Sequence, residues 1–146
     1  IETAWLIDRG CEVIGDEALT KKMLPITKAL TAEIYKTAYT DHSLLFERDR
    51  EVVNTNRIWW VQAEAVVGFI NGYEKDNSKT EYLEAAKDIW NYIENYVVDK
   101  RTGSEWFSEV DKDRKPIVTK EIVEPWKCPY HNGRMCFEVI RRNIDA

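Results

Sequence analysis

The chain has 146 residues, of which 44% are hydrophobic and 12% aromatic, so its composition suits a packed core and not a disordered chain. Its formal net charge is −5, and acidic and basic residues are interspersed along it. The sequence therefore has no cluster of basic residues of the kind that binds nucleic acid or an anionic membrane. No apolar run approaches the roughly 18–20 residues of a membrane span. We therefore expect neither nucleic acid nor a membrane as a partner, and a neutral substrate fits the charge better.

The first half of the chain predicts one long helix and a long connection. Apolar residues recur every three or four positions between residues 16 and 39, which is the period of an amphipathic helix, and Pro25 inside this stretch predicts a kink or a restart. Residues 41–58 carry mixed signals, because residues 43–49 resemble a short strand and residues 54–56 a turn. We expect this stretch to be a long functional connection.

The second half predicts a helical hairpin, an irregular segment and a last helix. Helical stripes cover residues 59–73 and 79–97, and the short turn between them makes the two helices antiparallel neighbours. Residues 99–118 contain turn chemistry around residues 105–110, which predict one arm of a small hairpin. The last helix is expected at about residues 133–143. Pairs of helices with small strands in some long loops indicate an all-helical barrel or solenoid of helical hairpins.

The cysteines favour reduced thiols over a disulfide framework. Cys11, Cys128 and Cys136 are an odd set without framework spacing, as is usual in a cytoplasmic protein. Cys128 and His131 also form a C-x-x-H pattern near Cys136. A structural zinc site needs four ligands, and the other histidine, His42, is far away in sequence, so this metal hypothesis is weak.

Residues 126–136 contain the first candidate for chemistry. Pro125 and Pro129 hold the approach extended, so His131 falls at the start of a helix, where the positive end of the helix dipole lowers the pKa of an imidazole. A histidine near neutrality can both accept and donate a proton. Arg134 lies on the same helical face and could hold a substrate oxygen. Taken alone, a histidine at a helix start is more often a cap than a catalyst.

Two further candidates pair a carboxylate with an indole ring. Trp60 and Glu64 are four residues apart and share a helical face, which suits a sugar stacked on the ring with a hydroxyl beside the acid. The alternative places Glu64 at a solvated helix edge. Glu2 and Trp5 repeat the pairing three residues apart, and the alternative for them is an exposed, frayed end.

Three segments in order resemble the cellobiose 2-epimerase branch of the N-acylglucosamine 2-epimerase superfamily. They are residues 1–5, residues 59–65, and residues 126–135, which read Trp-Lys-Cys-Pro-Tyr-His-Asn-Gly-Arg-Met and are the most diagnostic. In that family a histidine stands three residues before the acid that Glu2 matches, and this position lies outside the chain. The resemblance implies that residues 1–146 are the C-terminal portion of a single (α/α)6-barrel catalytic domain whose upstream half is absent here.

The resemblance further implies an all-α fold, part of an (α/α)6 barrel of helical hairpins with small β-hairpin elements in long loops. It implies an isomerase that opens the reducing-end glucose of a β-1,4-linked disaccharide, removes the C2 proton to give a cis-enediolate, and returns a proton to the other face. No metal or organic cofactor is expected, because the neighbouring carbonyl already acidifies that proton. The residues implied in catalysis are His131 and Glu2, and those implied in substrate binding are Trp5, Trp60, Glu64, Trp126 and Arg134.

Alternatives remain at this point. A mannose isomerase shares the enediolate but reprotonates C1 to give a ketose, and an N-acylglucosamine epimerase fits the last segment less well. From another class, the chain could be a carbohydrate-binding half-domain without turnover. Since half of a closed barrel exposes apolar helix flanks and one catalytic histidine lies outside the chain, we expect the missing half of the barrel as a partner and no activity from this chain alone.

Overall fold

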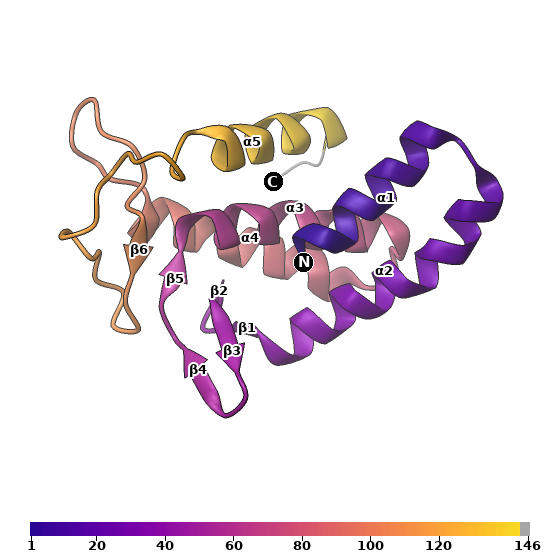
Figure 1. Ribbon diagram of the computed structural model, residues 1–146, viewed down its shortest axis with the longest axis horizontal. Helices are drawn as coiled ribbons and strands as arrows, with labels where there is room; N and C mark the ends of the chain where they lie inside the picture. Colours follow the sequence, from indigo (N-terminus) through magenta and orange to yellow (C-terminus); the bar gives the residue numbers. More distant parts are fainter. Residues whose placement is uncertain (144–146) are drawn as a thin grey trace.

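The fold is described from a computed structural model, which describes residues 1–143 (Figure 1). It is mainly helical with small antiparallel strand pairs, so the predicted fold class is confirmed. Within residues 1–143, no helix combines the length and the apolar character needed to cross a bilayer. The helices are α1 (Glu2–Ile14), α2 (Glu17–Thr37), α3 (Trp59–Lys75), α4 (Thr80–Tyr92), which continues into the π-helical turn η1 (Ile93–Val97), and α5 (Tyr130–Arg142).

The helices form antiparallel hairpins whose first members lie together. α1 pairs with α2 and α3 with α4, while α3 also packs against both α1 and α5. Figure 1 shows α1, α3 and α5 running in the same direction, with α2 and α4 returning. Their first turns therefore lie toward the same end of the molecule, and this end also carries the strand pairs.

Local signals explain where α1 ends and α2 begins. Gly15 caps α1 in the left-handed region at φ 72°, where glycine is favoured, and the Asp16 side chain then accepts a hydrogen bond from the Leu19 N–H at 3.0 Å. α2 confirms the helix predicted at residues 16–39. The predicted restart at Pro25 is wrong, because α2 runs unbroken through it. Pro25 is exposed, so water can satisfy the carbonyl that loses its helical partner.

Three short strand pairs lie in the connections, and all are antiparallel. The predicted small hairpin at residues 105–110 is present as local antiparallel bridges, Trp106 with Val98 and Val110 with Pro116. The last two residues of this segment also form a strand that pairs far back in sequence, with Arg57 opposite Val110. The pairing ties the loop before α5 to the start of α3. The strands are β1 (Tyr39–Thr40) with β2 (Ser43–Leu44), β3 (Glu47–Asp49) with β4 (Val52–Asn54), and β5 (Arg57–Ile58) with β6 (Glu109–Val110).

α3 is the central helix, buried on all sides from Val61 to Gly72. Phe69 is fully buried and packs against Tyr35 and Tyr82, which come from the two return helices. Burying such large apolar side chains is the main stabilising contribution. Small residues on this helix let other elements approach closely, as Gly72 shows below.

Gly72 tests this packing, because a Cβ built there lies 2.8 Å from Thr31 Cγ2 and 3.1 Å from the Tyr82 ring. We expect Gly72→Ala in the complete protein to lower the free energy of unfolding by about 1–3 kcal/mol, as overpacking does. Gly10→Ala is the matched control: nothing lies within 4 Å of its Cβ, and alanine in a helix is favoured by about 0.5–1 kcal/mol. Urea unfolding of both variants measures the two effects, and equal effects would contradict the packing.

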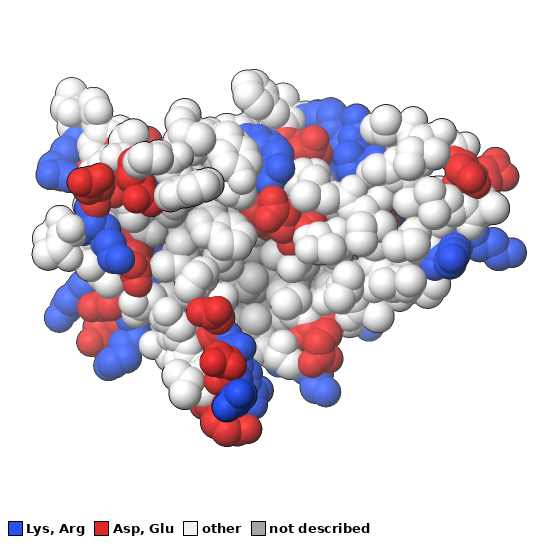
Figure 2. Space-filling model, viewed as in Figure 1, with Lys and Arg blue, Asp and Glu red and all other residues white. Residues whose placement is uncertain are grey.

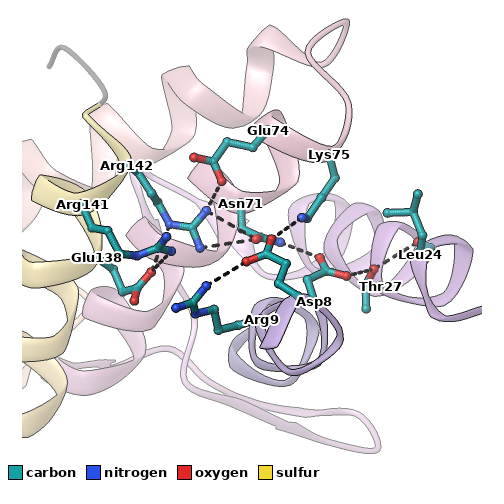
Figure 3. Close-up of polar contacts among 11 residues, drawn as sticks. Asp8, Arg9, Leu24, Thr27, Asn71, Glu74, Lys75, Glu138, Arg141 and Arg142 are labelled. Carbon is teal, nitrogen blue, oxygen red and sulfur yellow. Dashed lines mark hydrogen bonds and ion pairs between the residues drawn. The ribbon is translucent and has the colours of Figure 1, made fainter. Parts of the chain in front are cut away.

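A buried polar layer joins α1, α2 and α3 (Figure 3). The carboxylate of Asp8 in α1 accepts hydrogen bonds from the Thr27 hydroxyl of α2 and the Asn71 amide of α3, both at 2.7 Å. All three residues are at least 94% buried, with exposed fractions of 6%, 1% and 2%. Because buried polar groups are stable only when paired, this layer fixes how α1, α2 and α3 are rotated against each other.

Arg142 extends this polar layer to α5. Its guanidinium lies 3.4–3.5 Å from Asn71 Oδ1, is paired with Glu74 of α3, and lies 3.3 Å from Glu138 on its own helix. The Arg142 side chain is only 5% exposed. It therefore anchors the C-terminal end of α5 against α3.

Replacing Arg142 by Met in the complete protein should keep the packing of the aliphatic part of the side chain but leave buried hydrogen-bond acceptors unpaired. We therefore expect the free energy of unfolding to fall by about 1–3 kcal/mol. Arg141→Met is the control, because that side chain is 43% exposed and makes one exposed ion pair, expected to contribute less than about 1 kcal/mol. Urea unfolding distinguishes them. Similar losses in both variants would show that the buried layer does not stabilise the fold.

Candidate active site

Three polar side chains converge where α1, α3 and α5 begin. Glu2 lies in the first turn of α1, Glu64 in the second turn of α3, and His131 in the first turn of α5. One atom from each side chain lies within 4.8 Å of the others. Because the N-termini of α3 and α5 lie here, their unpaired N–H groups make this end favourable for negative charge.

Glu64 is the centre of the cluster and is 1% exposed. Its Oε2 accepts a hydrogen bond from the Trp5 indole N–H at 2.9 Å. Its Oε1 lies 2.7 Å from His131 Nδ1 and 2.6 Å from the Arg134 guanidinium. A buried carboxylate is tolerated only with such partners, so the solvated-edge alternative for Glu64 is wrong.

The His131 ring is held from several sides. Its side chain is 9% exposed, it stacks on Trp60 at 5.4 Å and 30°, and it meets Trp59 edge-on at 5.4 Å. Since a carboxylate only accepts hydrogen bonds, the bond to Glu64 places a proton on Nδ1. In the neutral ring Nε2 is then unprotonated, so it is the nitrogen that can accept a proton from a substrate.

Arg134 links the two acids, since its guanidinium bonds to both Glu2 and Glu64. Burial lowers the pKa of Arg134, but hydrogen bonds to Glu64 and Glu2 outweigh it, so the pKa lies above its ordinary value. The guanidinium also lies 5.1 Å from the Trp5 ring and 5.3 Å from the Tyr130 ring. Among the described residues, its Nε is the buried side-chain polar atom without a partner.

The carboxylates and the imidazole of this cluster do not form a ready metal-binding site. Glu2, Glu64 and His131 are close enough to share an ion, but Arg134 already places positive charge between the two acids, and His131 Nδ1 is bonded to Glu64. Cys128 and Cys136, the weak zinc candidates, are exposed. The arrangement is that of an ion-pair network around an imidazole.

A second set of contacts, which sequence reasoning missed, braces His131 from the loop side. The Lys127 side chain is 2% exposed, pairs with Glu105, and lies 4.9 Å from the centre of the Trp59 ring. The Asn132 amide also donates to Glu105. These contacts fix both the residue that follows His131 and the indole that packs against it.

The predicted tryptophans occupy different environments. Trp60 stacks on His131 and borders a cavity, and its contact with a sugar stays a prediction. Trp5 does not fit the expected open wall, because it is 2% exposed and its N–H is bonded to Glu64. Trp126 is 86% exposed, and the aromatic contacts to His131 come from Trp59, Trp60 and Tyr130, so its role as a wall stays a prediction.

A cavity of about 400 Å³ opens beside the cluster, bordered by Glu2, Trp60 and Glu64. Figure 2 shows a hollow at the centre of this face, with acidic and basic side chains at its edge. The volume lies within the roughly 300–1,000 Å³ of small-molecule sites. Helical hairpins with a buried histidine–carboxylate pair at the helix N-termini, beside such a cavity, define an all-α protein with an acid–base site.

Comparison with known proteins agrees with this class. The sequence profile of the N-acylglucosamine 2-epimerase (GlcNAc 2-epimerase) family matches residues 1–133, so the chain belongs to this family. A cellobiose 2-epimerase from Ruminococcus albus is 50% identical over 145 residues, which are 99% of this chain and 37% of the relative. The chain thus spans little more than a third of the length of the curated relatives that it matches.

Solved structures give the same result for the fold. The crystal structure of a sugar epimerase from a ruminal bacterium is 50% identical, with a TM-score of 0.96 over 99% of this chain and 37% of that one. The chain therefore has the fold of one part of an (α/α)6-barrel protein, as predicted. A D-mannose isomerase at 22% identity has a TM-score of 0.81 over 97% of this chain and 35% of its own, so it shares the fold alone.

Proposed function

We propose that residues 1–146 are the C-terminal portion of the catalytic domain of a sugar 2-epimerase. The substrate is the reducing-end glucose of a β-1,4-linked disaccharide such as cellobiose, which becomes glucosyl-mannose. The observation that carries the proposal is the buried His131–Glu64 pair beside the cavity, in a chain 50% identical to a cellobiose 2-epimerase over 99% of its length.

In the proposed reaction, the reducing glucose opens to its aldehyde, and one base removes the proton on C2. The electron pair moves onto the carbonyl oxygen, giving a cis-enediolate, and an acid on the other face returns a proton to C2. His131 Nε2 serves as one of these groups, and Glu64 stabilises the imidazolium that forms while Nε2 carries the proton. By family resemblance, the second group is the histidine expected three residues before Glu2.

Negative charge that develops on the sugar oxygen meets positive charge on the protein. Arg134 is held beside His131 by Glu2 and Glu64, so its positive charge lies close to that oxygen. The N-termini of α3 and α5 add their dipoles. Such groups are fixed before the reaction, so they stabilise the enediolate more than the neutral sugar.

The rest of the barrel is the proposed protein partner. An apolar groove of about 450 Å³ lies between α3, α4 and α5, lined by residues such as Val66, Trp90 and Met135. Nearby, Phe137 and Ile140 are each 75% exposed. Since the matched relatives are much longer than this chain, we expect their additional helices, in the complete protein, to cover this groove. A cytoplasmic location belongs to the same proposal.

Incubating the complete protein with cellobiose in heavy water tests the function. Epimerisation predicts deuterium at C2 of the reducing sugar and formation of glucosyl-mannose, both visible by NMR. Deuterium at C1 with a ketose product would instead indicate an aldose–ketose isomerase. Binding of the sugar with no exchange at either carbon would indicate the carbohydrate-binding alternative.

A further inference from the structure

The loop before α5 is folded around a buried ammonium group that the proposed reaction does not use. Lys127 Nζ donates to the Glu105 carboxylate and, at 2.7 Å, to the Ile122 carbonyl. Only 2% of the Lys127 side chain is exposed. Taking two charges out of water costs free energy that their attraction often fails to recover, and an apolar pair of similar volume is often as stable. Net stability is therefore a weak explanation for a charged pair at this place.

Glu105 bonds to the chain on both sides of His131. Its Oε2 accepts from Lys127, four residues before the histidine, and its Oε1 accepts from the Asn132 amide, directly after it. Glu105 is itself fixed to the segment that follows η1, because the Asp99 N–H donates to the Glu105 carbonyl at 3.1 Å. The first turn of α5 is thereby tied to the end of the α3–α4 hairpin.

The ion pair also reaches the imidazole through an aromatic ring. Lys127 Nζ lies 4.9 Å from the centre of the Trp59 ring, and this buried ring meets His131 edge-on at 5.4 Å and 76°. Two routes therefore lead from the pair to the histidine, one through Asn132 and one through Trp59. A lysine this shielded from solvent has no surface left for a sugar, so any effect on the reaction must pass through its neighbours.

We propose that Lys127 and Glu105 form a positioning pair that holds the His131 ring in the orientation needed for proton transfer. This rests on the proposed function, in which His131 Nε2 exchanges a proton with C2 of the sugar. A misplacement of about 1 Å can slow a reaction about 10²-fold, because the reacting atoms must be close and aligned. The pair thus raises the rate of the chemical step, while the affinity for the sugar does not depend on it.

Two variants of the complete protein test the members of the pair. Lys127→Met keeps the aliphatic packing without the charge, and Glu105→Gln keeps the size of the side chain. We expect each variant to lower kcat about 10- to 100-fold. The dissociation constant of cellobiitol, the open-chain sugar alcohol of cellobiose, should stay near the wild-type value. Calorimetry with cellobiitol also gives the fraction of protein that binds, so a purely structural role would lower this fraction and leave kcat per binding site unchanged.

The double variant tests whether the two residues act as a unit. Since both changes break the same contact, it should lose no more than the larger of the two single losses, whereas independent residues give losses that multiply. Asn132→Ala breaks the bond on the other side of His131 and should also lower kcat per binding site. Because Asn132 is neutral and half-buried, this variant leaves no buried charge unpaired and provides the test should Lys127→Met fold poorly.

Lys120→Met is the matched control. Lys120 lies in the same loop, but its side chain is 59% exposed and its amine lies 3.8 Å from Glu109, so kcat per binding site should match the wild type. With normal exchange at C2 in the wild type, unchanged kcat per site in the pair variants, an equal loss in Lys120→Met, or multiplying losses in the double variant overturns the positioning role alone. If the wild-type protein exchanges no hydrogen at C2 of cellobiose, the proposed function fails and the role of the pair with it.

Discussion

Replacing His131 by Asn in the complete protein should lower turnover of cellobiose about 10²–10⁴-fold, the usual contribution of a general acid–base group. Asn has a similar size and can keep a hydrogen bond to Glu64, but it cannot carry a proton to and from carbon. Binding of cellobiitol should therefore change little. Steady-state kinetics and calorimetry measure the two effects separately.

His42→Asn is the control for this variant. It replaces the other histidine of the chain, whose side chain is 64% exposed and lies 2.8 Å from Asp88, a residue not found in the His131 cluster. Its turnover should match the wild type. Near-normal turnover in His131→Asn, or an equal loss in both variants, would remove His131 from the mechanism.

Glu64→Gln should lower turnover about 10- to 100-fold, a typical effect of removing a group that orients a reacting side chain. Trp5, His131 and Arg134 all donate hydrogen bonds to Glu64. The glutamine amide cannot accept from all three, because its NH2 group is itself a donor. The charge that stabilises the imidazolium is also lost. Glu64→Asp keeps the charge and should recover part of the rate.

Glu74→Gln serves as the comparison on the same helix, since Glu74 pairs with Arg142 away from the cluster. It should affect stability and leave kcat near the wild-type value. Kinetics of the three variants, each checked for folding by circular dichroism, separate a positioning role of Glu64 from a general effect on α3. Wild-type kcat in Glu64→Gln would contradict the role assigned to this carboxylate.

Much of the fold was predictable because it depends on local periodicity. The helices around Thr31, Val66 and Ile89 follow the apolar repeats of their own segments. The β5–β6 pairing was not predictable, because Ile58 and Glu109 are brought together only by the packing of everything between them. The restart predicted at Pro25 was wrong for a related reason, because only the structure shows that this residue lies on an exposed face.

The site was predictable as a set of residues but not as a set of contacts. Helical spacing placed Trp60 with Glu64 and His131 with Arg134, yet it could not show that His131 bonds to a carboxylate 67 positions away. The predicted contact of Glu64 with a substrate hydroxyl stays a prediction. Lys127 gave no signal, because a lysine beside a proline-rich loop is normally solvated, and burial here depends on Glu105.

The most direct test of the account is a crystal structure of the complete protein with cellobiitol. We predict that C2 of the sugar alcohol lies within about 4 Å of His131 Nε2, close to the separation of reacting atoms, with Arg134 beside an adjacent oxygen. A sugar alcohol bound away from His131, or a His131 ring separated from C2 by other protein atoms, would contradict it.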